Sequence, residues 1–129
     1  MNFPPDHPLS ERVRGICMAY PEAVEVMSHG RCTFRAGKRQ FAIVGVYDIS
    51  AVVFIPDDSE RHALLERSDV FVPPYEGAYG WLAIRLTAEA GDWRLLAELL
   101  DTSYRCVALQ RQLRALDEGG AAASRLDSP

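Results

Sequence analysis

The chain has 129 residues, of which 48% are apolar and 25% are charged. This balance is typical of one folded globular domain and excludes a disordered or fibrous chain. The longest nearly continuous apolar run, over residues 49–55, is far shorter than the roughly 20 residues that a membrane-spanning helix requires. The N-terminus shows no basic segment followed by an apolar one, so we expect a cytoplasmic protein without membrane contact.

The net charge is −4, from 14 Lys and Arg against 18 Asp and Glu, which counts against a general attraction to nucleic acid. The cations are unevenly distributed, however, because residues 31–39 contain four of them and no acid. A local basic patch is therefore possible on a chain that is acidic overall. The widely spaced Cys17, Cys32 and Cys106 contain no C-x-x-C pair, so we expect free thiols without a disulfide framework or a zinc site.

The first predicted element is a helix over residues 8–20. Leu9, Val13 and Ile16 recur there at helical spacing, with Asp6 as the expected N-cap and Pro21 as the end of the helix. Two antiparallel strands follow over residues 23–29 and 31–36. The second alternates cleanly, so that Cys32, Phe34 and Ala36 share one face while Arg31, Thr33 and Arg35 share the other.

The middle of the chain predicts more strands. Residues 40–46 are apolar on both faces, as in a central strand, and residues 51–55 form another strand after a turn over 47–50. Asp57 and Glu60 have capping-box spacing for a helix that ends at Arg67. A short extended piece over 70–72 then leads into a loop rich in proline and glycine, and residues 81–86 form the last strand.

The C-terminal part predicts one long helix that begins after its expected N-cap, Asp92, and ends at about Leu116. We expect a break near Thr102 and Ser103, because these residues are weak helix formers. Residues 117–129 have little to bury, and we expect a disordered tail. Strands joined mainly by hairpins, with helices at both ends, predict an α+β fold in which helices cover one face of an antiparallel β-sheet. We expect one domain over residues 1–116.

Catalytic motifs are missing from this sequence. His7, His29 and His62 stand at no metal-ligand spacing, and there is no nucleophile elbow, S-x-x-K motif or phosphate-binding glycine loop. Helix capping explains the acidic pair Asp57 and Asp58 better than acid–base chemistry does. We therefore expect no catalytic residues, no metal and no cofactor.

The strongest remaining cluster is the basic hairpin. Arg31 and Arg35 lie on one strand face, with Lys38 and Arg39 at the adjacent turn, an arrangement that could set several cations against phosphates. The alternative, which composition alone favours, is a solvated face whose arginines pair with acids at positions 22, 25 or 48. Arg105, Arg111 and Arg114 form a second group on the last helix, which is also typical of a solvated face.

Three segments resemble the MmcQ/YjbR family of small bacterial proteins, in that family's order and spacing, over roughly residues 9–115. They are "CTFRAGKRQFAIV" after "YPEAVEVMSHG", then "PPYEGAYGWLAIRL", then "DWRLLAELLDTSYRCVA". The resemblance implies a sandwich similar to the frataxin-like CyaY fold and a double-wing mode of DNA binding. It does not extend to iron, because the first helix carries Glu11 beside Arg12 and Arg14 instead of an acidic ridge.

Carried over by position, the resemblance implies a first wing on the basic hairpin and a second around the later loop. The implied residues are Arg31, Arg35, Lys38 and Arg39 in the first wing, and Tyr75, Tyr79, Trp81 and Arg85 in the second. Two alternatives stay open for the loop aromatics: they plug the end of the sheet against the last helix, or they line a pocket for a protein or small ligand. For DNA we expect weak, salt-dependent binding by a monomer.

Overall fold

The computed structural model describes the backbone of residues 2–127 and the side chains of residues 2–119. Its centre is a six-stranded antiparallel sheet in the order β1-β2-β3-β4-β6-β5. The strands are β1 (Ala23–Ser28), β2 (Arg31–Ala36), β3 (Arg39–Val46), β4 (Ile49–Phe54), β5 (Val70–Phe71) and β6 (Leu82–Arg85). The helices are α1 (Pro8–Cys17), α2 (Arg61–Leu65), α3 (Trp93–Val107) and α4 (Gln110–Asp127), with 3-10 turns η1 (Asp58–Glu60) and η2 (Glu76–Tyr79).

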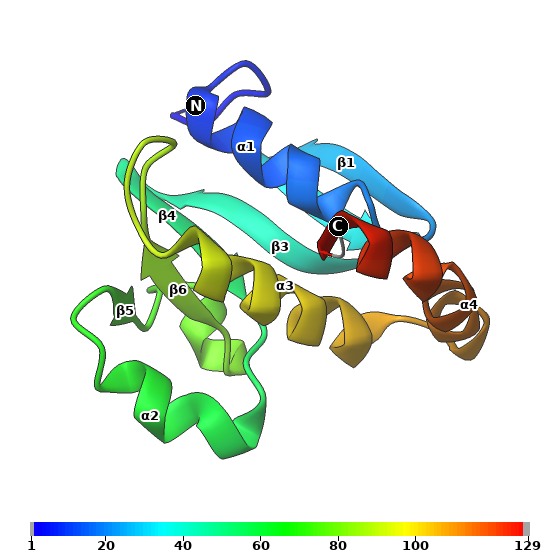
Figure 1. Cartoon of the computed structure of the whole chain (residues 1–129). Coiled ribbons are helices and arrows are strands. Elements are labelled where there is room, and N and C mark those ends of the chain that lie inside the picture. Colours follow the sequence, from blue (N-terminus) through cyan, green and yellow to red (C-terminus); the bar gives the residue numbers. More distant parts are fainter. Residues whose placement is uncertain (1, 128–129) are drawn as a thin grey trace.

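Helices α1 and α3 lie side by side against one face of the sheet (Figure 1). Their buried side chains form the main core with the inward residues of β2, β3, β4 and β6. Cys32, Phe34 and Ala36 of β2 belong to this core, as their alternation predicts. The predicted α+β fold, an antiparallel sheet covered on one face by helices, is confirmed.

The opposite face of the sheet, which we call the second face, carries a smaller apolar cluster of Ile43, Val46, Ala51, Val53 and Ala83. Trp81 and Phe71 pack against this cluster. No helix is needed to cover it, because the loop between β5 and β6 folds back across the sheet. Its residue Glu76 accepts from Arg31 on β2 at 2.7 Å, although two strands, β3 and β4, separate β2 from β6 in the sheet.

Strand β3 is apolar on both faces because each face packs against an apolar cluster, and its register shifts twice. One shift, near Arg35 of β2, brings both Phe41 and Ala42 to the helix side, and the other lies between Val44 and Val46. Gly45 occupies this second bulge with a φ of +97°, where a side chain would be strained. A Cβ there would also lie 2.1 Å from the ring of Phe3, so glycine fits this position on two grounds.

The helix ends agree partly with their prediction. Asp92 caps α3 by accepting from the amide of Leu95 at 3.0 Å, as predicted. Helix α1 is capped by His7 and not by Asp6, because the His7 Nδ1 accepts from the amide of Leu9. The helix ends at Cys17 instead of continuing to residue 20. After the expected cap Asp57, the helical segment ends at Leu65, before the predicted end at Arg67.

The predicted break near Thr102 and Ser103 is wrong, because α3 continues through both residues to Val107. Ser103 is fully buried and uses its hydroxyl outside the helix. The hydroxyl donates to the carbonyl of Phe41 and accepts from the amide of Ile55 at 2.9 Å, joining the ends of β3 and β4 to α3. A residue that weakens a free helix is here a cross-link between helix and sheet.

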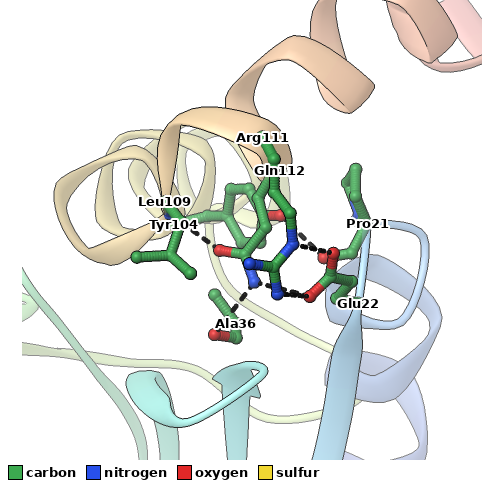
Figure 2. A network of polar contacts seen from close by, with 7 residues as sticks. All are labelled: Pro21, Glu22, Ala36, Tyr104, Leu109, Arg111 and Gln112. Carbon is green, nitrogen blue, oxygen red and sulfur yellow. Dashed lines mark hydrogen bonds and ion pairs between the residues drawn. The ribbon is translucent and has the colours of Figure 1, made fainter.

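The long helix breaks instead at Ala108, whose extended backbone separates α3 from α4. The buried Gln112 organises this junction (Figure 2). Its Oε1 accepts from the amide of Leu109, which resembles the reciprocal bond of a capping box. Its Nε2 donates to Glu22 at 2.9 Å and to the carbonyl of Ala36 at 3.4 Å. The first turn of α4 is therefore tied to the open end of the β1–β2 hairpin, where the chain enters β1 and leaves β2.

Glu22 completes this junction by a two-point ion pair with Arg111, at 3.0 Å and 2.9 Å. These bonds from Arg111 and Gln112 hold the pKa of Glu22 below its ordinary value. Tyr104 of α3 adds a further tie, since its hydroxyl donates to the carbonyl of Pro21 at 2.6 Å (Figure 2). Four polar contacts therefore converge on the loop before β1.

Helix α4 runs on to Asp127 through most of the segment expected to be a tail. Side chains beyond residue 119 lie outside the described residues, and disorder over 117–129 stays a prediction. In the described part of the chain, no helix is long and apolar enough to cross a membrane.

Replacing Ser103 with Ala is expected to leave two buried backbone groups, the carbonyl of Phe41 and the amide of Ile55, without their partner. Such a loss costs about 1–3 kcal/mol in the free energy of unfolding. The neighbouring Thr102→Ala is the control, because Thr102 is less buried and makes no side-chain hydrogen bond in the described structure. Urea unfolding of both variants measures the difference, and equal stability of the two would contradict the cross-link.

The Glu22 junction predicts a pH dependence of stability. A carboxyl whose pKa is lowered by folding stabilises the fold above its ordinary pKa, near 4.3, and loses this contribution as the pH falls through the lowered value. Glu22→Gln should therefore flatten the decline of stability below about pH 5, while Glu98→Gln, at an exposed acid of α3, should leave the profile unchanged. Unfolding midpoints from pH 3 to 7 test this, and identical profiles for Glu22→Gln and wild type would refute it.

Candidate functional site

The structure distributes the cations of the first predicted wing along one hairpin, while the residues of the second wing lie on the loop before β6 and on β6 itself. Strand β2 begins at Arg31 and ends at Ala36, and β3 returns from Arg39 to Val46. At about 3.3 Å per residue, the two ends of β2 lie roughly 17 Å apart. Lys38 and Arg39 lie at one end of the hairpin, and Arg31 lies at the other. The predicted eight-residue set therefore does not form a single cluster.

At the turn end, Lys38 and Arg39 are exposed beside the first turn of α4. Gln112 connects the two segments, because its Nε2 reaches the carbonyl of Ala36 and lies 3.2 Å from the position of a Cβ on Gly37. Arg111 and Arg114, three residues apart near the start of α4, are both exposed, and Arg111 reaches this junction through its ion pair with Glu22. We call Lys38, Arg39, Arg111 and Arg114 the basic corner. It unites the two cationic groups that the sequence shows more than 70 residues apart.

The charge of the basic corner is only partly neutralised. Glu22 pairs with Arg111, and its lowered pKa keeps it ionised near neutral pH. Lys38, Arg39 and Arg114 make no ion pair among the described side chains. Three cations with long, flexible stems therefore remain available to a polyanion at this corner.

Arg35 lies near the same end of the hairpin but on the second face, opposite Val24 of β1 and Gln40 of β3. It is half-buried, and its Nε is buried without a hydrogen-bond partner. It makes no ion pair in the described part of the chain. Two of the three acids expected as partners for the strand arginines bind elsewhere: Glu22 pairs with Arg111, and Glu25 pairs with Arg14 of α1 at 2.7 Å. The third, Asp48, makes no ion pair among the described side chains.

Arg31 is committed to a structural role. Its guanidinium donates to Glu76 at 2.7 Å and to the carbonyl of Gly45 at 3.2 Å, and only 20% of its side chain and 13% of that of Glu76 are exposed. This pair holds the loop of the second predicted wing against the sheet. Among the described side chains, Arg31 is thus the cation of the first predicted wing that is engaged in an ion pair.

The residues of the second predicted wing differ in their surroundings. Trp81 packs on the apolar cluster of the second face and not against the last helix, and Arg85 stacks over the ring of Phe71 at 4.8 Å. Tyr75 and Tyr79 are 77% and 81% exposed, so they do not plug the end of the sheet.

A half-open cavity of about 660 Å³ lies at the Arg31 end of the hairpin. We call it the tyrosine pocket, since Tyr47 from the β3–β4 turn and Tyr75 from the loop both line it. The Arg31–Glu76 pair, His29 and Asp48 also border it. Tyr79 and Trp81 do not line it, so the pocket predicted near Tyr75, Tyr79 and Trp81 is displaced toward Tyr47. Sequence reasoning assigned Tyr47 only to a turn, and its 71% exposure is visible only in the structure.

Comparison with known proteins agrees with this architecture. The YjbR family model matches residues 18–106. A crystal structure of a Deinococcus radiodurans protein with a DUF419 domain superposes with a TM-score of 0.66 at 18% identity, covering 85% of this chain and 90% of that one. That likeness shows the fold, and no curated protein matches the sequence. The family match covers most of the chain and confirms the resemblance, so the chain belongs to the YjbR family.

Proposed function

We propose that this protein is a non-catalytic, cytoplasmic nucleic-acid-binding module that contacts phosphates through the basic corner. One observation supports the proposal most: the β2–β3 turn, which carries Lys38 and Arg39, lies against the start of α4, the segment that carries Arg111 and Arg114. Cations from a hairpin and from a helix can then bind successive phosphates from two directions. Sequence-independent binding of DNA depends largely on such contacts.

The number of available cations sets the expected strength of binding. Lys38, Arg39 and Arg114, together with Arg35 on the adjoining face, give about four phosphate contacts. The net charge of −4 opposes approach of a polyanion to the rest of the surface. We therefore infer weak binding that falls steeply with salt, by a monomer that uses neither a metal nor a membrane.

The second predicted wing takes a smaller part in this proposal. Arg85 is engaged with Phe71, Trp81 packs on the sheet, and Arg31 is paired with Glu76. These three residues shape the second face and support the loop. Tyr75 and Tyr79 are the most exposed aromatic residues of that wing, and Arg85 is exposed as well beside the ring of Phe71.

Neutralising the turn tests the basic corner. In Lys38→Gln/Arg39→Gln, the slope of log affinity against log salt for duplex DNA should decrease in magnitude by about 1.8, since each phosphate contact contributes about 0.9. Arg94→Gln is the matched control, because Arg94 is an exposed cation on α3 without an ion pair in the described structure. Fluorescence anisotropy at several salt concentrations measures both slopes.

Binding that is unchanged in the double variant, with the fold intact by circular dichroism, would contradict the basic corner. Equal losses in the double variant and in Arg94→Gln would show a general charge effect and would also contradict it. The absence of any DNA or RNA binding at low salt would overturn the proposed function itself.

A further inference from the structure

We propose that the tyrosine pocket binds an unpaired nucleobase, either as a free nucleoside or within a single strand. The single-strand form rests on the proposed function, whereas binding of a free nucleoside does not depend on the basic corner. The cavity of about 660 Å³ is in the range of small-molecule sites. Three features of its lining support this ligand class.

The first feature is the backbone of Tyr47. It is the first residue of the two-residue turn between β3 and β4, and its φ is +54°. Hairpins of this length usually carry Gly, Asn or Asp at positive φ, and a bulky residue there is strained. The fold itself gains nothing evident from this ring, because the side chain is 71% exposed. Strain of this kind is typical of residues kept for function.

The second feature is the way both tyrosines are held. The Asn2 side-chain amide donates to the carbonyl of Tyr47 at 3.2 Å, which fixes the turn from the N-terminal side. Tyr75 precedes Glu76, which is anchored to the sheet by its ion pair with Arg31. The backbone around Tyr75 is also held by a turn, in which the amide of Gly77 donates to the carbonyl of Pro73 at 2.9 Å. Both exposed rings thus stand on fixed backbone, as stacking platforms for bases require.

The third feature is the charge of the lining. Arg31 pairs with Glu76, so the carboxylate of Asp48 is the acidic group of the lining that has no cation as a partner among the described side chains. A phosphate inside the pocket would meet this carboxylate without a free cation. A neutral planar base instead finds tyrosine rings together with side-chain donors and acceptors, as bases do in single-strand sites. The pocket therefore selects the base, and a phosphate attached to it must point outward.

The test uses the full-length, ¹⁵N-labelled protein and titrates it with adenosine, guanosine, cytidine and uridine, and with the matching 5′-monophosphates. At least one nucleoside should shift the amides of Tyr47, Asp48, Tyr75 and Glu76, and its monophosphate should bind no more tightly. Tyr75→Ala should weaken this binding about tenfold through loss of a stacking surface. Tyr79→Ala is the matched control, because Tyr79 is equally exposed on the same loop but does not line the pocket.

A second variant separates ligand binding from folding. Tyr47→Gly removes a ring and relieves a positive φ at the same position, so it should raise the melting temperature while it weakens nucleoside binding. No amide shifts at the pocket with millimolar nucleosides, or equal losses in the Tyr75 and Tyr79 variants, would overturn the inference. A monophosphate that binds more tightly than its nucleoside at the pocket would also overturn it.

Oligonucleotides distinguish this inference from the proposed function. Both proposals are supported if Tyr75→Ala weakens binding of a single strand but not of a duplex, and if neutralising Lys38 and Arg39 weakens binding of both. If nucleosides fail to bind but single-strand binding depends on the basic corner, only the pocket falls. If nucleosides bind and no oligonucleotide does, the proposed function falls, and the pocket is a site for free nucleosides.

Discussion

The ion pair between Arg31 and Glu76 is the contact on which the second face of the sheet depends. It joins the first residue of β2 to the loop between β5 and β6, so this loop must reach past β4 and β3 to form it. With the loop in place, Val46, Val53 and Ala83 are buried without a covering helix. The pair is mostly shielded from water, and losing a charged hydrogen bond of this kind costs about 1.5–3 kcal/mol, more than a surface ion pair contributes.

The same contact accounts for the division between the two candidate surfaces. The contact engages Arg31 of the basic strand and forms part of the wall of the tyrosine pocket. Lys38 and Arg39, which make no ion pair among the described side chains, lie at the opposite end of the β2–β3 hairpin. There a second polar junction, formed by Glu22, Arg111 and Gln112, brings α4 to the β2–β3 turn. Two local junctions at the ends of one hairpin thus position the two surfaces for which we propose ligands, the basic corner and the tyrosine pocket.

The sequence predicts local features well and long-range contacts poorly. Alternation in β2 places Cys32 and Phe34 in the core, and the cap at Asp92 is identified by residue type. The helix break predicted at Ser103 is wrong, because the low helix propensity of this residue is outweighed by its hydrogen bonds to backbone groups more than 40 residues away. The partners of Arg31 and Glu22 cannot be read from a single sequence, since each pairs with an acid or a base from a distant element. Tyr47 is recognisable only from its backbone angle and exposure.

Amide hydrogen exchange of the loop residues is the measurement that tests this account most directly. If the Arg31–Glu76 pair holds the loop on the sheet, Glu76→Gln should accelerate exchange at Gly77, Gly80 and Trp81, whose amides are hydrogen-bonded within the loop. The amides between β2 and β3 should keep their protection. Unchanged exchange in the loop would show that packing of Trp81 and Pro73 alone holds it, and would contradict the central role of the ion pair.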